Sequence, residues 1–229
     1  GNPVEKIKAV MHHTKPDAVY FDCNPLRGPR KLQETIAADA MCKVFVVDTH
    51  NIVPIWVVSQ KQEVGAYTLR PKLHKLLAAY LIEPERLQHH PHEWPGIIQS
   101  LDTLQPMINE VLARIRENNT HISRQSGPLA AAEHLESFIS TKLERYAVDR
   151  NDPSSGAQSD LSPYLHFGQV SSLRVALRLQ EVSIQNGSNL HFLSSPKMPK
   201  PEDAQTILQH GIDSLIEEMV VRKELADNF

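Results

Sequence analysis

The sequence predicts an open α/β fold in the first part of the chain and an all-α fold in the last part. Short apolar runs with strand preferences alternate with helical patterns through the first eighty residues, and apolar spacings of three and four residues dominate from residue 129 onward. Between the two parts, five prolines are spread through residues 83–128. We therefore expect a partial α/β domain at residues 1–82, an interdomain connection at 83–128 and part of a helical domain at 129–229.

Four elements in the first part alternate between helix and strand. They are a helix at residues 4–11, a strand at 18–21, a helix at 31–41 and a second, buried strand at 44–47. Helix, strand, helix and strand in succession predict a parallel sheet, because parallel strands need long crossover connections of this kind.

An acidic residue and a polar loop follow each expected strand. Asp22 stands before residues 23–27, and Asp48 stands before residues 49–51. Ligands of open α/β sheets bind at the carboxyl ends of the strands, so these loops could line a ligand crevice. Turn and capping roles, which we favour on the residues alone, explain the same pattern. No glycine-rich fingerprint is present, which argues against a dinucleotide-binding dehydrogenase.

Two further apolar segments complete the α/β part. Residues 52–58 are apolar, and we expect Trp56 to lie in the core with its neighbours. Residues 71–81 predict a helix, whose buried face consists of Leu73, Leu76, Leu77 and Tyr80. This helix is the last element that we assign to the α/β domain.

The connection contains one predicted helix, near residues 107–116. His89, His90 and His92 suggest a metal site, but no carboxylate or cysteine at ligand spacing supports one. We therefore expect a solvated loop there, with Trp94 anchoring it.

The helical part contains three predicted helices and one surface insertion. The first helix covers residues 129–145, with a buried stripe of Ala132, Leu135, Phe138, Ile139, Leu143 and Tyr146. Ser171 is the expected N-cap of the second helix, which carries Leu173, Leu177 and Val182. The insertion covers residues 183–200. The longest helical pattern follows at 202–228, with Leu208, Ile212, Leu215, Met219 and Val220 directed inward.

Composition limits the function classes. The formal net charge is −3, and residues 129–229 contain 9 Lys and Arg against 14 Asp and Glu, so any DNA contact must come from a local basic patch. Cys23 and Cys42 lack metal-ligand spacing, and we expect free thiols in a reducing compartment. No apolar run approaches the roughly 18 residues that span a bilayer, and no secretory signal opens the chain. We expect an intracellular monomer, cytoplasmic or nuclear, with no membrane partner.

The chain begins with Gly-Asn-Pro and its last residues continue a helical pattern. We therefore expect a piece of a longer protein, without the start of the α/β domain and without the end of the helical domain.

The segment at residues 146–168 is polar beyond the needs of a connector. Ser162-Pro163 predicts a helix start, with Ser as the N-cap and Pro at the first helical position. Ser159, Asp160 and Leu161 lead into that start, so their N–H groups and the two serine hydroxyls would meet where the helix dipole is positive. Such a site suits a phosphate or pyrophosphate. On the residues alone, an ordinary capped helix that binds nothing explains the segment as well.

Several motifs resemble one known family. Tyr146, Arg150 and the run Gln-Ser-Asp-Leu-Ser-Pro-Tyr-Leu-His-Phe-Gly at 158–168 resemble the flavin-binding segment of DNA photolyases, and of class II cyclobutane pyrimidine dimer photolyases in particular. The run Glu-Glu-Met-Val-Val-Arg-Lys-Glu-Leu-Ala-Asp-Asn-Phe at 217–229 is similar to a second signature of that family. Shorter segments that resemble the same family follow both expected strands, and another lies at residues 61–70. The resemblance is weakest at 83–128 and 183–200.

The resemblance implies a role for ten residues. Tyr146, Gln158, Ser159, Asp160, Leu161 and Ser162 would bind FAD, the last four around its pyrophosphate, although Gln158 stands where related photolyases often have Thr. Arg150, Arg222 and Lys223 would contact DNA. Glu218, in an apolar pocket, would hydrogen-bond the pyrimidine dimer. Without the family, an ion pair of Arg150 with Asp149 or Asp152 and a surface pair of Glu218 with Arg222 are the alternatives.

The implied activity is light-driven repair of cyclobutane pyrimidine dimers by electron transfer from reduced FAD, with the dimer flipped out of the DNA. A second antenna chromophore, of deazaflavin or folate type, is a further expectation. The alternatives are a cryptochrome-like photoreceptor with the same fold and flavin and, if the resemblance is set aside, a generic α/β nucleotide-binding protein with a helical cap. We expect the 229 residues alone to bind FAD poorly and to repair little.

Overall fold

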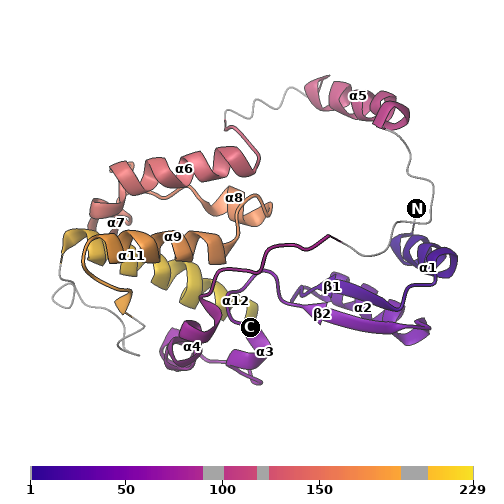
Figure 1. The fold of residues 1–229 in the computed structure, drawn as a ribbon, viewed down its shortest axis with the longest axis horizontal. Coiled ribbons are helices and arrows are strands. Elements are labelled where there is room, and N and C mark those ends of the chain that lie inside the picture. The colour runs from indigo at the N-terminus through magenta and orange to yellow at the C-terminus, as the bar shows by residue number, and fades with distance from the viewer. Residues whose placement is uncertain (1, 90–100, 118–123, 192–205, 229) are drawn as a thin grey trace.

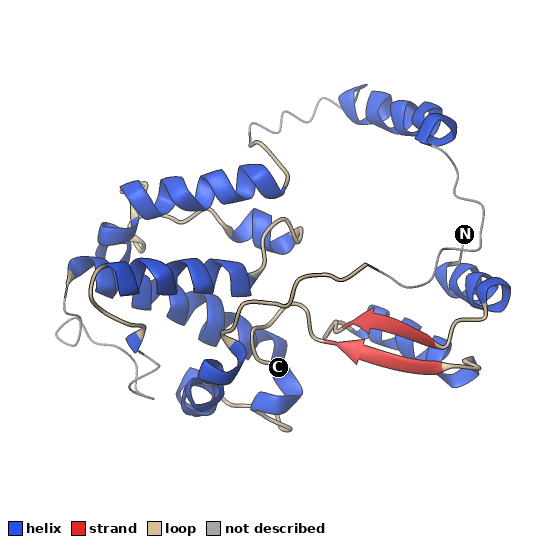
Figure 2. Cartoon of the chain, viewed as in Figure 1, coloured by secondary structure: helices blue, strands red, loops and turns tan. Residues whose placement is uncertain are grey.

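The computed structural model describes residues 2–89, 101–117, 124–191 and 206–228 (Figure 1). In chain order, a small α/β part precedes a larger group of helices, as the sequence predicts (Figure 2). Among the described residues, no helix combines the length and the apolar character needed to cross a membrane.

The α/β part consists of α1 (Pro3–Thr14), β1 (Ala18–Asp22), α2 (Arg27–Asp39) and β2 (Lys43–Val47). The two strands are parallel, in register from the pair Ala18 and Lys43 to the pair Asp22 and Val47. The predicted order of elements is therefore confirmed, although α2 begins and ends earlier than predicted. Helix α1 begins where Asn2 accepts a hydrogen bond from the Val4 N–H at 3.0 Å, with proline next to the cap.

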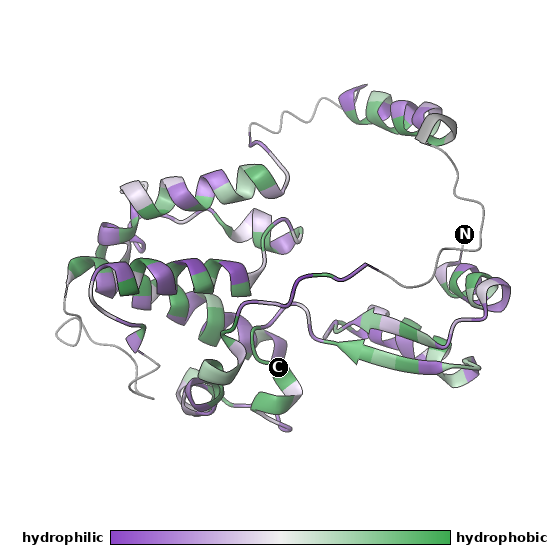
Figure 3. Cartoon of the chain, in the orientation of Figure 1, coloured by the Kyte–Doolittle hydropathy of each residue, from purple (hydrophilic) through white to green (hydrophobic). Residues whose placement is uncertain are grey.

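The prediction that β2 is buried was wrong. Phe45 is 42% exposed, and Val46 and Val47 are about equally open. Figure 3 shows β2 largely in the green of apolar residues, so the sequence pattern is real. The described sheet has only two strands, and Tyr20 and Phe45 stack on each other at 5.1 Å while both remain exposed.

The segment after β2 folds into two helices, α3 (Ile55–Val58) and α4 (Ala66–Tyr80). Trp56 is 42% exposed, so its expected place in the core was wrong, whereas Ile52, Val53 and Val58 are buried. Helix α4 begins before the predicted residue 71 and contains Pro71. Its predicted inner face is confirmed, with Leu73 and Leu77 buried and Leu76 and Tyr80 partly buried against the core.

Helix α5 (Leu101–Glu117) is longer than the predicted helix and contains Pro106. His90, His92 and Trp94 lie outside the described residues. His89 is exposed, as expected for a solvated loop, and the described part of the chain contains no group of three metal-ligating side chains.

The helical part consists of α6 (Pro128–Thr141), α7 (Leu143–Asp149), α8 (Ser162–His166), α9 (Ser172–Gln185), α11 (Ile207–Ile216), η2 (Glu217–Arg222) and α12 (Lys223–Asn228). The helix predicted at 129–145 is interrupted at Lys142, and Ala131 is buried in place of Ala132, which is exposed. The expected cap of α9 is confirmed, because Ser171 accepts a hydrogen bond from the Arg174 N–H at 3.1 Å.

The last three elements form one continuous helical run from Ile207 to Asn228. All five side chains predicted to point inward are buried or partly buried. The run contains a π-helical segment, η2, which the sequence pattern does not reveal. Part of the predicted insertion at 183–200 belongs to α9, Leu190 is buried, and residues 192–205 lie outside the described part.

One apolar cluster holds most of these elements together. It includes residues from 52–81, such as Leu69 and Leu77, and residues from the helical part, such as Phe138, Leu179 and Ile212. The helices α3 and α4 therefore share their core with the helical part. The C-terminal helix α12 lies next to α3, which brings the end of the chain close to this segment (Figure 1).

Candidate functional site

A close contact between α7 and α11 brings two distant segments together. A Cβ atom added to Gly211 would lie 2.0 Å from the carbonyl oxygen of Leu143, so only glycine permits this approach. Leu143 and Ile212 are both fully buried in the same region. The contact brings Tyr146 on α7 and Arg150, the C-cap of α7, toward η2.

Tyr146 lies in a buried position between an aromatic ring and a cation. Its ring makes an edge-on contact with Phe138 at 5.5 Å between centroids, and the Arg150 guanidinium lies 5.6 Å from its centroid. Burial raises the pKa of Tyr146 above its ordinary value, and the negative charge of Glu218 acts in the same direction. Tyr146 therefore stays a neutral phenol at physiological pH.

Glu218 faces two guanidinium groups. Its Oε1 lies 3.4 Å from Nη2 of Arg150 and 3.2 Å from Nε of Arg222. The expected apolar pocket was wrong, because the side chain is 31% exposed and contacts these two cations. Glu218 pairs with Arg222, as we predicted for the case without the family resemblance. The alternative predicted for Arg150 was wrong, because among the described residues it pairs with Glu218 and not with Asp149 or Asp152.

These four side chains, Tyr146, Arg150, Glu218 and Arg222, form what we name the arginine–glutamate cluster. It carries two positive charges and one negative charge, with an aromatic ring behind it. Such a set can bind an anion or a polar planar group, since guanidinium groups present several donors in one plane. The sequence places Tyr146 and Glu218 far apart, and the structure brings them together.

The segment at 158–162 differs from the expected helix start. Leu161, with φ −79° and ψ −18°, occupies the N-cap position, and no side chain caps α8. The predicted capping role of Ser162 was wrong, because Leu161 is buried and already has helical dihedral angles, which leaves Ser162 inside the helix. The expected helix at Ser162-Pro163 itself is confirmed.

The backbone of this segment has the shape of an anion cradle. Asp160 has a left-handed φ of 54° and precedes Leu161, which is right-handed. A left-handed residue beside a right-handed one turns successive N–H groups to the same side, an arrangement that binds anions. The N–H groups of residues 159–162 donate to no other residue that the structure describes.

Two cations flank the cradle. Arg124 Nη2 and Lys142 Nζ lie 3.6 Å and 3.7 Å from the Asp160 carboxylate. Ser159 is held through its carbonyl oxygen, 2.9 Å from Nε2 of His134. Sequence reasoning missed Arg124, Lys142 and His134, since nothing local marks them as neighbours of residues 158–162.

Gln158 connects the cradle to the arginine–glutamate cluster. Its side-chain amide donates a hydrogen bond to the backbone carbonyl oxygen of Arg150. The backbone carbonyl oxygen of Gln158 accepts a hydrogen bond from Nζ of Lys142 at 3.4 Å. Gln158 therefore links the segment expected to bind a flavin to Arg150, one of the residues expected to contact DNA.

Lys223 holds two segments of the chain together. Its ammonium donates to the carbonyl oxygen of His50 at 2.9 Å and to Oδ1 of Asn51 at 2.7 Å. Next to it, the buried carboxyl of Glu224 accepts a hydrogen bond from the Ile52 N–H at 3.2 Å. Burial raises the pKa of Glu224 to about 8. Both contacts attach α12 to the loop after β2.

Sequence reasoning also missed a buried ion pair beside Glu218. Arg70 on α4 binds the carboxylate of Glu217, with Nη2 2.6 Å from Oε1 and Nε 3.1 Å from Oε2. No local pattern could have revealed it, because the two residues stand 147 positions apart.

Asp48 serves in a turn, as the residues alone favoured, whereas Asp22 joins the two loops that follow the strands. Asp22 accepts a hydrogen bond from the Thr49 hydroxyl at 3.0 Å, and Asp48 accepts from the N–H groups of Asn51 and Ile55, both at 3.0 Å. A cavity of about 590 Å³ lies beside this loop, lined in part by Cys23, Asn24, Arg30, Trp56 and Asp227. Burial raises the pKa of the Cys23 thiol.

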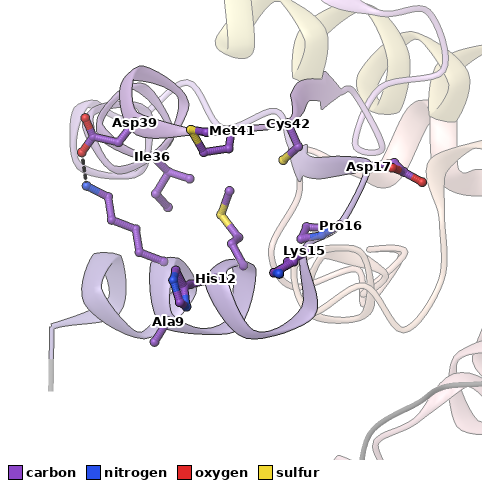
Figure 4. Close-up of a pocket in the computed structure, with 11 residues that line it drawn as sticks. Ala9, His12, Lys15, Pro16, Asp17, Ile36, Asp39, Met41 and Cys42 are labelled. Carbon is purple, nitrogen blue, oxygen red and sulfur yellow. Dashed lines mark hydrogen bonds and ion pairs between the residues drawn. The ribbon is translucent and has the colours of Figure 1, made fainter.

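A larger cavity of about 760 Å³ lies between α1 and α2 (Figure 4). Ile36, Met41 and Cys42 line it, and an ion pair from Lys8 to Asp39 closes one side. Met41 and Cys42 stand just before β2, so this cavity lies at the amino ends of the strands. Ligands of open α/β sheets bind at the opposite edge.

Comparison with known proteins identifies related sequences. Residues 1–95 match a family model described as DNA photolyase. The whole chain is 33% identical to a deoxyribodipyrimidine photo-lyase of Arabidopsis thaliana, of which it covers 43%, and 34% identical to one of Potorous tridactylus, of which it covers 36%. It therefore spans less than half the length of these curated relatives.

A solved structure has a similar fold. A bacterial class III photolyase from Agrobacterium tumefaciens matches 85% of this chain with a TM-score of 0.50 and 16% identity, and the match covers 40% of that protein. At this identity the match concerns the fold alone. It agrees with the predicted succession of a partial α/β part and a helical part.

Proposed function

We propose that the chain belongs to the DNA photolyase family, and that the protein containing it repairs cyclobutane pyrimidine dimers in DNA with light and a reduced FAD. The observation that carries the proposal is the arginine–glutamate cluster. Its members come from α7, from the residue that follows α7 and from η2, and both segments were expected at a flavin and lesion site from the resemblance alone. We further propose that the protein is of class II.

The residues at 158–162 fit a pyrophosphate. Their N–H groups have no other acceptor among the described residues, and Arg124 and Lys142 supply positive charge beside them. We propose that Ser159, Asp160, Leu161 and Ser162 hold the FAD pyrophosphate there, with Tyr146 and Gln158 as further FAD contacts. The reduced flavin, when bound, supplies the electron that light excites.

The cluster residues would then bind the lesion. Arg150 and Arg222 would contact DNA phosphates or the edge of the flipped dimer, since fixed guanidinium groups orient DNA without reading its sequence. Glu218 would exchange one of its arginine contacts for a hydrogen bond to the dimer. Lys223 would contribute least, because its ammonium already contacts His50 and Asn51.

Repair by the full-length protein tests this proposal. Purified protein should show flavin absorbance and should remove dimers from irradiated oligonucleotides under blue light but not in the dark. Glu218→Ala should lower the repair rate by about tenfold or more with the flavin still bound, because a transition-state contact is lost. Glu83→Ala, which removes an exposed carboxylate from the pair with Arg174, is the matched control.

Two other results would contradict the proposal. A flavoprotein that leaves the dimers intact in light would be a photoreceptor of cryptochrome type. A full-length protein without flavin bands would be a nucleotide-binding protein of another kind.

A further inference from the structure

We propose that Arg70 is a positioning residue of the lesion site, which orients Glu218 through its ion pair with Glu217. The inference rests on the proposed function in taking Glu218 as the lesion contact. Arg70 touches neither the cluster nor the cradle in the described contacts. It acts on the residue that precedes Glu218 in the chain.

The ion pair has a geometry that fixes orientation as well as position. Nε of Arg70 lies 3.0 Å and 3.1 Å from the two carboxylate oxygens of Glu217, and Nη2 lies 2.6 Å from Oε1. A guanidinium that bridges both oxygens holds the plane of the carboxylate, which a lysine ammonium cannot do. The side chains are only 13% and 4% exposed, so solvent competes little with this contact.

Stability alone does not account for the pair. Removing two charges from water costs free energy that their attraction often fails to recover, and apolar residues of similar size are frequently as stabilising. The best-attested use of such buried polar pairs is to select one arrangement of packed elements over another. Here the pair joins α4 to the first residue of the π-helical segment η2.

The direction in which the Glu218 side chain points depends on the π-helical segment η2, which contains it. An extra residue in a helical turn rotates the rest of the helix by roughly 100°, since each residue of an α-helix turns by that angle. Such segments are rare and need neighbouring contacts to persist. Both ends of η2 are held, by Arg70 on Glu217 at the start and by Lys223 and Glu224 on the loop after β2 just past the end.

The contacts form a continuous path to the cluster. Arg70 holds Glu217, the next residue Glu218 meets Arg150, and Arg150 lies over the ring of Tyr146. Loss of the two-pronged contact between Arg70 and the Glu217 carboxylate, which we call the fork, would allow the start of η2 to rotate. The Glu218 carboxylate would then no longer contact Arg150. A helix at 66–80, outside the lesion site, would thus determine how well that site recognises a dimer.

Binding of dimer-containing and undamaged DNA by the full-length protein tests the inference. Arg70→Lys keeps the positive charge but cannot contact both carboxylate oxygens in one plane, and it should lower the ratio of the two affinities by about tenfold or more, the size of one charge-assisted hydrogen bond. Affinity for undamaged DNA should change much less, because contacts with phosphates depend mainly on the positive charges of Arg150 and Arg222, which the variant retains. Arg70→Met should lower the ratio further.

Arg178→Lys is the matched control. Arg178 makes a similar fork to Glu136, with Nε and Nη2 2.7 Å and 2.9 Å from its oxygens, and neither residue touches the cluster. This variant should keep the wild-type ratio. An Arg70→Lys protein whose ratio stays within about twofold of wild type would overturn the inference.

A crystal structure of the Arg70→Lys protein separates this inference from the proposed function. The contact between Glu218 and Arg150 should be lost in the variant, and its retention would overturn the positioning role. A wild-type protein without preference for dimer-containing DNA would instead contradict the proposed function and leave the structural comparison to decide the role of Arg70. If Arg70→Met fails to fold, Arg70→Lys alone decides.

Discussion

Residues 2–51 contain a single buried side chain, that of Ile36, whereas residues 52–81 and the helical part share an extensive apolar cluster. Both regions have enough apolar residues for a core. Tyr20, Phe45 and Val46 remain exposed on the two-stranded sheet, while Leu179 and Ile212 in the helices are fully covered. Parallel sheets are normally covered on both faces, whereas these side chains of the two-stranded sheet lack such cover among the described residues.

The comparison also bears on the domain limits. The limits predicted from the sequence, at residues 82 and 128, remain a prediction. Helices α3 and α4 pack into the apolar cluster of the helical part. We therefore propose that the boundary between the two packing units lies nearer residue 50. The apolar area that the helical part buries should account for most of the hydrophobic free energy of this chain.

The largest difference in the free energy of unfolding between the two regions is expected when one glycine in each region is replaced by alanine. Gly211→Ala would place Cβ 2.0 Å from the Leu143 carbonyl oxygen, and forcing α11 away from α7 should lower the free energy of unfolding by about 3 kcal/mol or more. Gly28→Ala on α2 meets no atom within 4 Å and should change it by less than about 1 kcal/mol, because alanine favours helices. Urea unfolding of both variants measures these changes. Equal losses of unfolding free energy would contradict the expected difference between the two regions.

Two core truncations sharpen the same comparison. Leu179→Ala should cost about 3 kcal/mol of unfolding free energy, since the side chain is fully buried. Phe45→Ala should cost about 1 kcal/mol or less in the 229-residue chain, where that ring is 42% exposed. The same pair in the full-length protein is informative, because a much larger cost for Phe45→Ala there would indicate that another element covers the sheet.

A gradual effect, spread over several pH units, is expected at Glu224, where α12 contacts the loop after β2. Burial raises the pKa of Glu224 to about 8 from 4.5, so the folded protein keeps a proton that the unfolded chain has released between these values. The free energy of unfolding should therefore fall as pH rises through this window, by at most about 1.4 kcal/mol per pH unit, and level off above about pH 8.

Glu224→Gln should remove most of this slope in urea unfolding measured across the window. Ile212→Val, which lowers stability at a buried apolar position, should retain the wild-type slope and serves as the control. A Glu224→Gln protein with an unchanged slope would show that other groups cause the dependence.

Local patterns predicted most of the elements. The strands at 18–21 and 44–47 and the inner face of 207–228 follow from apolar spacing, which depends only on neighbours in the chain. The errors occurred where packing decides. Trp56 and Val46 look like core residues in the sequence, but the elements that cover a side chain lie elsewhere in the chain.

The candidate site divides in the same way. Residues 158–162 and 218 were selected from motifs, and the alternative pair of Glu218 with Arg222 was predictable from a spacing of four. The contacts of Arg150 with Glu218, of Arg124 with Asp160 and of Arg70 with Glu217 were not, because each joins segments that local periodicity cannot relate.

The sequence by itself determined the order of the helices and strands, most of their apolar faces and the motifs that resemble those of DNA photolyases. Only the tertiary structure decided that η2 is π-helical, that Gly211 lets α7 and α11 approach, and that Glu218 meets two arginines. The physical reason is that these features depend on contacts between residues far apart in the chain, while propensity and periodicity act only over a few turns.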